Sequence, residues 1–112
     1  MRPNLLPVDP LSQVVFIHDY FQLVFQDSCF SIYNVAALRS SDVTLQQGRH
    51  GFCDTLVKLI GQSLLTAVAH DDSSLTLTFQ EGTALSVASV GLGPEAWQFN
   101  CAGKSIVVAQ NA

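Results

Sequence analysis

The sequence predicts an α+β domain that is mostly β: two antiparallel β-meanders plus a C-terminal hairpin, packed as a sandwich or half-barrel, with one short helix. Over most of the chain, apolar residues alternate with polar ones, which is typical of half-buried strands. Short clusters of Gly, Asp, Ser and Gln separate these segments, as turns require. One segment instead has helical spacing. The length of 112 residues predicts a single domain, 1–112, that buries a core without disulfide bonds.

The strands are predicted from this alternation. The clearest hairpin is LTLTFQEGTALSV at residues 75–87, where the turn QEGT separates two alternating segments. The face expected to be buried carries Leu75, Leu77, Phe79, Leu85 and Val87. The eight predicted strands cover residues 13–19, 21–26, 29–34, 63–70, 74–79, 84–90, 96–101 and 105–110.

The other segments are predicted to be an arm, a loop and a helix. Residues 1–12 contain three prolines and are expected to form an extended N-terminal arm. Residues 36–50 lose periodicity and predict a long loop, with a short ordered piece around Asp42 to Leu45. The helix is predicted in FCDTLVKLIGQ, because Phe52, Leu56, Leu59 and Ile60 have helical spacing and Gly61 is placed to end it.

The two predicted meanders resemble each other. In the first, His-Asp precedes FQLVFQDSCFSI, and in the second, His-Asp precedes SLTLTFQEGTALSV. Phe25-Gln26-Asp27 matches Phe79-Gln80-Glu81, and Leu23 matches Leu77. The similarity has two explanations: a true duplication, or two hairpins that meet the same physical needs. Either one predicts two similar β units that face each other.

Composition narrows the classes of function. Charged residues make up only 12% of the chain and hydrophobic residues 48%, which favours a binding or self-association face. Five scattered Lys and Arg residues cannot neutralise a phosphate backbone, so nucleic acid is not expected as a partner. The formal charge of −4 favours a basic protein partner instead. No membrane association is expected, because the chain has no signal peptide and no apolar run of spanning length.

The cysteines and histidines give weak signals for chemistry. An odd number of cysteines, Cys29, Cys53 and Cys101, argues for a reducing cytoplasm, and their apolar neighbours predict core packing. His50 and Cys53 form one pair, whereas structural zinc requires four ligands, so no metal is expected.

No cofactor or catalytic residue is expected either. GLGP and QQGRHG lack phosphate-loop spacing. His18-Asp19 and His70-Asp71 could act as acid–base pairs, but both lie where a strand enters a turn, which is an ordinary place for such residues. Trp97, the only tryptophan, is expected in the core, with an interface anchor as the alternative.

Acidic residues in turns are the candidate binding residues. Turns lie at the surface, where these carboxylates either provide solubility or meet the Lys and Arg residues of a basic partner. The candidates are Asp19, Asp27, Asp71, Asp72 and Glu81, in predicted hairpin turns, and Asp42, in the predicted central loop.

The second half, LIGQSL…SLTLTFQEGTALSV…GPEAW, resembles small bacterial proteins that are similar to immunity proteins of contact-dependent growth inhibition and other polymorphic toxin systems. Such proteins bind and block a toxic nuclease domain. The resemblance implies a cytoplasmic, non-catalytic, tightly binding protein, and it transfers no binding residue because immunity proteins contact toxins in different ways.

Three functions follow as expectations. The first is an immunity protein, monomeric or weakly dimeric, that neutralises a cationic toxin domain with its acidic loops. The second is a small-molecule-binding or self-associating structural β module, which requires an apolar cavity or an unpaired edge strand. The third is an enzyme, which requires His18 and His70 to meet in one cleft.

Overall fold

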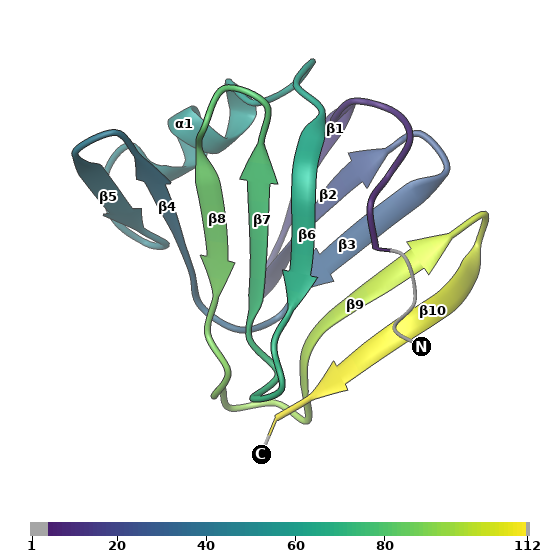
Figure 1. Ribbon diagram of the computed structural model, residues 1–112. Helices are drawn as coiled ribbons and strands as arrows, with labels where there is room; N and C mark the ends of the chain where they lie inside the picture. Colours follow the sequence, from purple (N-terminus) through teal and green to yellow (C-terminus); the bar gives the residue numbers. More distant parts are fainter. Residues whose placement is uncertain (1–4, 112) are drawn as a thin grey trace.

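The computed structural model describes residues 5–111, which form two five-stranded antiparallel sheets that face each other (Figure 1). The predicted fold class is confirmed: the chain is mostly β with one short helix, and the two sheets do not join into a closed barrel. The elements are β1 Gln13–Ile17, β2 Tyr20–Phe25, β3 Ser28–Ile32, β4 Ala36–Ser40, β5 Val43–Gln46, α1 Phe52–Val57, β6 Leu64–Ala69, β7 Leu75–Phe79, β8 Ala84–Val87, β9 Glu95–Cys101 and β10 Lys104–Gln110.

Each sheet combines a meander from one half of the chain with a hairpin that follows the other meander. The first sheet has the order β1-β2-β3-β9-β10, and the second has the order β5-β4-β8-β7-β6. The hairpin β4–β5 follows β3 in the chain but pairs with β8 in the second sheet. The hairpin β9–β10 follows β8 in the chain but pairs with β3 in the first sheet. The two similar units expected from the sequence are therefore present as meanders, and they exchange hairpins.

The hairpin β7–β8 has the register that the alternation predicts. Leu75 pairs with Val87 and Leu77 with Leu85, and all five residues expected on its inner face are buried. Gly82 adopts a φ of 101° in the turn, a conformation that glycine accepts without strain. In the shorter turn of the first meander, between β2 and β3, Gln26 is the residue with a positive φ, of 59°.

The prediction of a long loop at residues 36–50 was wrong, because these residues contain β4 and β5. The described part of the chain therefore has ten strands rather than eight. Ala36 and Leu38 are buried by pairing with Val87 and Leu85 of β8, far along the chain. The ordered piece expected near Asp42 to Leu45 corresponds to β5.

The helix is shorter than the spacing predicts. It ends at Val57, and turn-type hydrogen bonds lead the chain on to Gly61, whose φ is 98°. Phe52, Leu56 and Leu59 are buried as expected. Ile60 was expected to face the core but is 44% exposed, because the regular helix no longer sets its direction.

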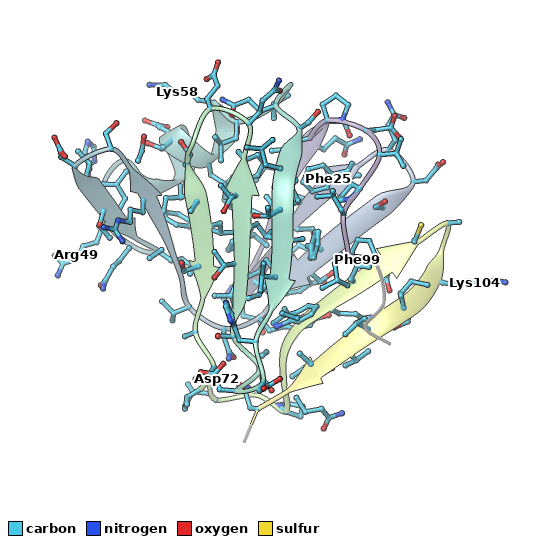
Figure 2. The ribbon with its side chains drawn as sticks, in the orientation of Figure 1. Phe25, Arg49, Lys58, Asp72, Phe99 and Lys104 are labelled. Carbon is cyan, nitrogen blue, oxygen red and sulfur yellow. The ribbon has the colours of Figure 1, made fainter. Side chains whose placement is uncertain are left out.

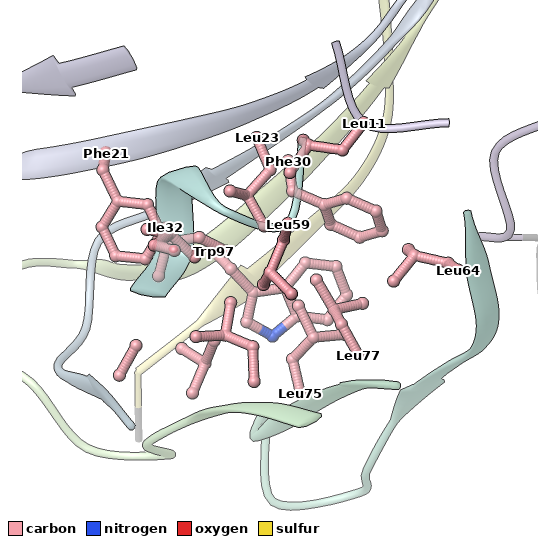
Figure 3. Close-up of a cluster of buried hydrophobic side chains, with 14 of the residues drawn as sticks. Leu11, Phe21, Leu23, Phe30, Ile32, Leu59, Leu64, Leu75, Leu77 and Trp97 are labelled. Atoms are coloured by element: carbon pink, nitrogen blue, oxygen red, sulfur yellow. The ribbon is translucent and has the colours of Figure 1, made fainter. Parts of the chain in front are cut away.

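The core lies between the sheets and is rich in aromatic rings (Figure 3). Phe30 contacts Trp97 and Phe99, with ring centroids 6.5 and 4.7 Å apart. Trp97 is 1% exposed, which confirms its expected core position, and its indole N–H donates to the Ser73 carbonyl at 2.9 Å. This bond ties the β6–β7 turn of one sheet to β9 of the other.

The two open sides of the sandwich are covered differently. Helix α1 contacts β1 and β4 and fills one side. On the other side, β6 and β10 lie next to a cleft that Leu5 of the N-terminal arm also lines, which we call the second cleft. The part of the arm at residues 1–4 lies outside the described residues, and Leu5 and Leu11 are buried. Within residues 5–111, no helix has the length and apolar character to cross a bilayer.

The cysteines only partly match the expected core positions. All three are free thiols. Cys29 and Cys101 are half-buried, and burial raises the pKa of the Cys29 thiol above its ordinary value. The expectation was wrong for Cys53, which is exposed on α1 because the helix turns its Phe52 and Leu56 side toward the core.

Candidate functional site

Antiparallel strands place their connections at two ends of the sandwich, and one of these ends collects both linkers that pass from sheet to sheet. We call this the crossover end. It consists of the β1–β2 turn, the β3–β4 linker, the β6–β7 turn and the β8–β9 linker, at residues 18–19, 33–35, 70–74 and 88–94. The β6–β7 turn and the β8–β9 linker form the lower end of the molecule in Figure 1, beside the C-terminus.

A pair of asparagines fixes the two linkers together. Asn34 is 4% exposed, and its side-chain amide donates to the Ala88 carbonyl at 2.8 Å and to Asn111 Oδ1 at 2.6 Å. In return, Asn111 Nδ2 donates to Asn34 Oδ1 at 3.1 Å and to the Gly93 carbonyl at 2.7 Å. Because a buried amide is costly to leave unsatisfied, this reciprocal pairing defines one position for each linker.

Gly91 permits this arrangement because it lies directly against Asn34. A Cβ atom at position 91 would stand 1.9 Å from Asn34 Oδ1 and 2.6 Å from Asn34 Cγ, far inside van der Waals contact. Gly91, the first glycine of GLGP, is therefore explained by close packing against Asn34 and not by phosphate binding.

A cleft of about 450 Å³ opens beside the asparagine pair. Tyr33, Asn34 and Val35 of the β3–β4 linker line it, together with Asp19 and residues 91–95. The Tyr33 hydroxyl donates to Gln98 Oε1 at 3.2 Å, and its ring lies 5.1 Å from that of Tyr20. Burial raises the pKa of Tyr33, so the phenol stays neutral.

The four connections that form this end carry acidic residues and no lysine or arginine, whereas the β5–α1 connection, which starts at the same end beside Ala36, carries Arg49. Asp19, Asp71 and Asp72 lie in its turns, and Glu95 begins β9. Hydrogen bonds from the Ser74 hydroxyl and backbone N–H hold the pKa of Asp72 below its usual value, so this carboxylate stays charged at mildly acidic pH. Figure 2 shows Asp72 at this end, with Lys58 at the opposite end.

The structure divides the six predicted binding residues between the two ends. Asp19, Asp71 and Asp72 lie at the crossover end, where Asp19 lines the cleft beside Asn34 and Asp71 lines the second cleft. All six are exposed. The other three lie in turns at the opposite end, where Glu81 Oε2 accepts a hydrogen bond from Gln62 Nε2 at 2.9 Å; these residues are Asp27, Asp42 and Glu81.

Exposed aliphatic residues accompany the acidic ones, and the sequence prediction missed them. Val35 is 63% exposed, Val90 is 72% exposed and Leu92 is fully exposed. The alternating pattern extended the last strand of the second meander to Val90, but β8 ends at Val87. Exposure of Leu92 could have been predicted from its position between two glycines, because no strand is expected there to bury its side chain.

The two His-Asp pairs do not meet in one cleft. Their turns begin from β1 and β6, which are edge strands on opposite sides of the sandwich. Asp19 lines the cleft of the crossover end, whereas His70 and Asp71 line the second cleft, of about 420 Å³. His70 Nε2 lies 3.1 Å from Thr76 Oγ1 of its own hairpin. The geometry required for the enzyme hypothesis is therefore absent from the described residues.

The described residues also contain no group of three or more His, Cys, Asp or Glu side chains that could hold a metal ion. His50 and Cys53 are both exposed near the start of α1.

A family model with the description "Family of unknown function (DUF6188)" matches residues 11–111, which is nearly the whole chain. No curated protein and no solved structure matches.

Proposed function

We propose that this chain, which belongs to the DUF6188 family, is a non-catalytic binding protein that captures a cationic protein partner at its crossover end. One observation carries the proposal: acidic side chains and exposed aliphatic residues surround a cleft at the same rigid end.

The two kinds of residue have different effects on binding. Carboxylates on exposed turns attract a basic partner over a distance and orient it, which mainly increases the association rate. Buried aliphatic contacts supply affinity once water is excluded, and Val35, Val90 and Leu92 are available for this. The Asn34–Asn111 pair holds the surface in one shape, so little ordering is required on binding.

An immunity protein is the biological role that we propose for this surface. A toxic nuclease domain is cationic because it binds a phosphate backbone, and an acidic protein end that covers its basic face competes directly with nucleic acid. This role places the protein in the cytoplasm, where such a toxin acts.

Co-expression with the product of the gene immediately upstream tests the proposal. We expect a toxin-like C-terminal domain to co-purify with this chain, and its toxicity to be suppressed. The Asp19→Asn/Asp72→Asn double variant should weaken capture by about tenfold at low ionic strength, as expected for the loss of two steering charges. The Asp27→Asn/Asp42→Asn variant removes the same charge from the opposite end and should leave capture within about twofold.

Two results would contradict the proposal. One is equal weakening by both double variants, because that would show a general charge effect rather than a site. The other is an upstream gene without a toxin-like domain, together with no capture of basic proteins.

A self-associating β module is the second candidate, supported by the edge strands. Natural edges are usually protected by charge, proline or a bulge. β6 and β10 contain register shifts at Leu65 and Ile106, whereas β1 is regular, uncharged and exposes Phe16 and Ile17. Sedimentation or light scattering distinguishes the candidates, since a stable homodimer without any partner favours self-association.

A further inference from the structure

We propose that the cleft of the crossover end holds an arginine side chain of the protein partner. This inference rests on the proposed function, because it names the group that the acidic end recognises. Two carboxylates line the cleft, Asp19 from the β1–β2 turn and Glu95 from the start of β9, and Tyr33, Val35 and Leu92 supply its aromatic and aliphatic walls. An arginine side chain has the matching parts: an aliphatic stem and a planar cationic end.

The size of the cleft limits what can enter it. Its volume of about 450 Å³ lies in the range of small-ligand sites, roughly 300–1,000 Å³. A single long side chain fits, whereas a helix or strand of the partner does not. The partner's backbone would then lie over Leu92, at the exposed rim of the cleft, and over the exposed Val90 next to it in the chain.

Tyr33 favours guanidinium over ammonium. Its hydroxyl is fixed by Gln98 and its ring contacts Tyr20, so the ring is held in place before a ligand arrives. A planar guanidinium can stack on such a ring while its N–H groups donate to carboxylates, whereas a lysine ammonium is attracted to the ring face but has no planar group to stack on it. The neutral phenol adds no charge of its own.

The cleft is also built to stay open. Asn34 forms part of its lining and is held by Ala88 and Asn111, while Asn111 fixes the Gly93 carbonyl on the opposite linker. The linkers on both sides therefore have fixed positions, which reduces the entropic cost of binding a side chain between them.

Titration of the full chain with N-acetyl-arginine amide, followed by two-dimensional NMR, tests the inference. We expect saturable shifts at millimolar probe that are confined to Asp19, residues 33–35 and residues 91–95. N-acetyl-citrulline amide, which has the same shape without the charge, should give no saturable shift. N-acetyl-lysine amide should bind about threefold or more weakly than the arginine probe.

Variants assign the effect to the cleft. Glu95→Gln should weaken the arginine probe about threefold to fivefold, the upper range for one exposed ion pair. Asp27→Asn, at the opposite end, serves as the matched control and should leave affinity unchanged. The Trp97 fluorescence of each variant shows that it is folded.

The inference is overturned if citrulline binds as well as arginine, if lysine binds equally well, or if Glu95→Gln and Asp27→Asn behave alike. Its failure can be distinguished from failure of the proposed function. If the Glu95→Gln variant still captures the partner with full affinity, the proposed function stands and the arginine site falls. If the arginine probe binds but no basic protein is captured, the arginine site stands and the proposed function falls.

Discussion

Replacement of Gly91 by alanine should destabilise the protein strongly, although the change adds one methyl group on an exposed linker. The new Cβ would lie 1.9 Å from Asn34 Oδ1 and 3.3 Å from Asn111 Nδ2. Asn34 is buried and cannot swing into solvent without losing its bonds to Ala88 and Asn111. Either the linker or the asparagine pair must move.

The magnitude follows from these two costs. Overpacking a well-filled site costs about 1–3 kcal/mol. Loss of a buried amide hydrogen bond adds about 1–3 kcal/mol, because a polar group is left unsatisfied. We therefore expect Gly91→Ala to lower the free energy of unfolding by about 2–6 kcal/mol, a large fraction of the roughly 5–15 kcal/mol that typical domains have.

Urea unfolding followed by the fluorescence of Trp97, the only tryptophan, measures this change. The chain provides a matched control two residues away. A Cβ at Gly93 would meet no atom within 4 Å, so Gly93→Ala should change the free energy of unfolding by less than about 0.5 kcal/mol.

Equal stability of Gly91→Ala and Gly93→Ala would refute the reasoning. A double-mutant cycle gives a second check. In an Asn34→Ala background the obstructing amide is gone, so adding Gly91→Ala should cost little. A full penalty in that background would show that the clash with Asn34 is not the cause.

Three further results are expected. Leu77→Ala should lower the free energy of unfolding by about 3–5 kcal/mol in urea titrations, because Leu77 is fully buried between the sheets. Trp97→Phe should cost about 2–4 kcal/mol by thermal unfolding followed by circular dichroism, since it removes buried volume and the hydrogen bond to Ser73. The free energy of unfolding should fall above about pH 9. Burial raises the pKa of Cys29 and of Tyr33 above their ordinary values of 9.0 and 10.0. At high pH the unfolded chain therefore releases protons that the native state keeps, which favours unfolding. Cys29→Ala should flatten the first part of that decline in urea titrations at several pH values.

Local pattern was enough to predict most of the strands. The segment at residues 75–87 alternates, contains a glycine turn and needs nothing outside itself to define its register. Residues 36–46 show the limit of such reasoning. Their polarity and short length gave no periodic signal, and burial of Ala36 and Leu38 depends on β8, which lies about half the chain away.

The candidate site was less predictable than the fold. Acidic turn residues were identifiable one by one, but which of them share an end depends on the strand directions in both sheets. Glu95 could not be found as their neighbour because it follows a linker and begins a strand. The cleft itself requires the β3–β4 and β8–β9 linkers to meet, and no local pattern encodes that contact.

The exchanged hairpins also determine when each sheet can be completed during synthesis of the chain. β3 emerges from the ribosome long before its neighbour β9, and β4 emerges before β8, so the second sheet is finished only when β8 is made and the first only when the hairpin β9–β10 is made. Closing such long loops before their contacts form slows folding. A chain that stops short of Glu95 would leave β3 as a bare edge with Phe30 uncovered, which favours aggregation and removal by proteases. The exchange thus makes the stability of each sheet depend on strands from both halves of the chain.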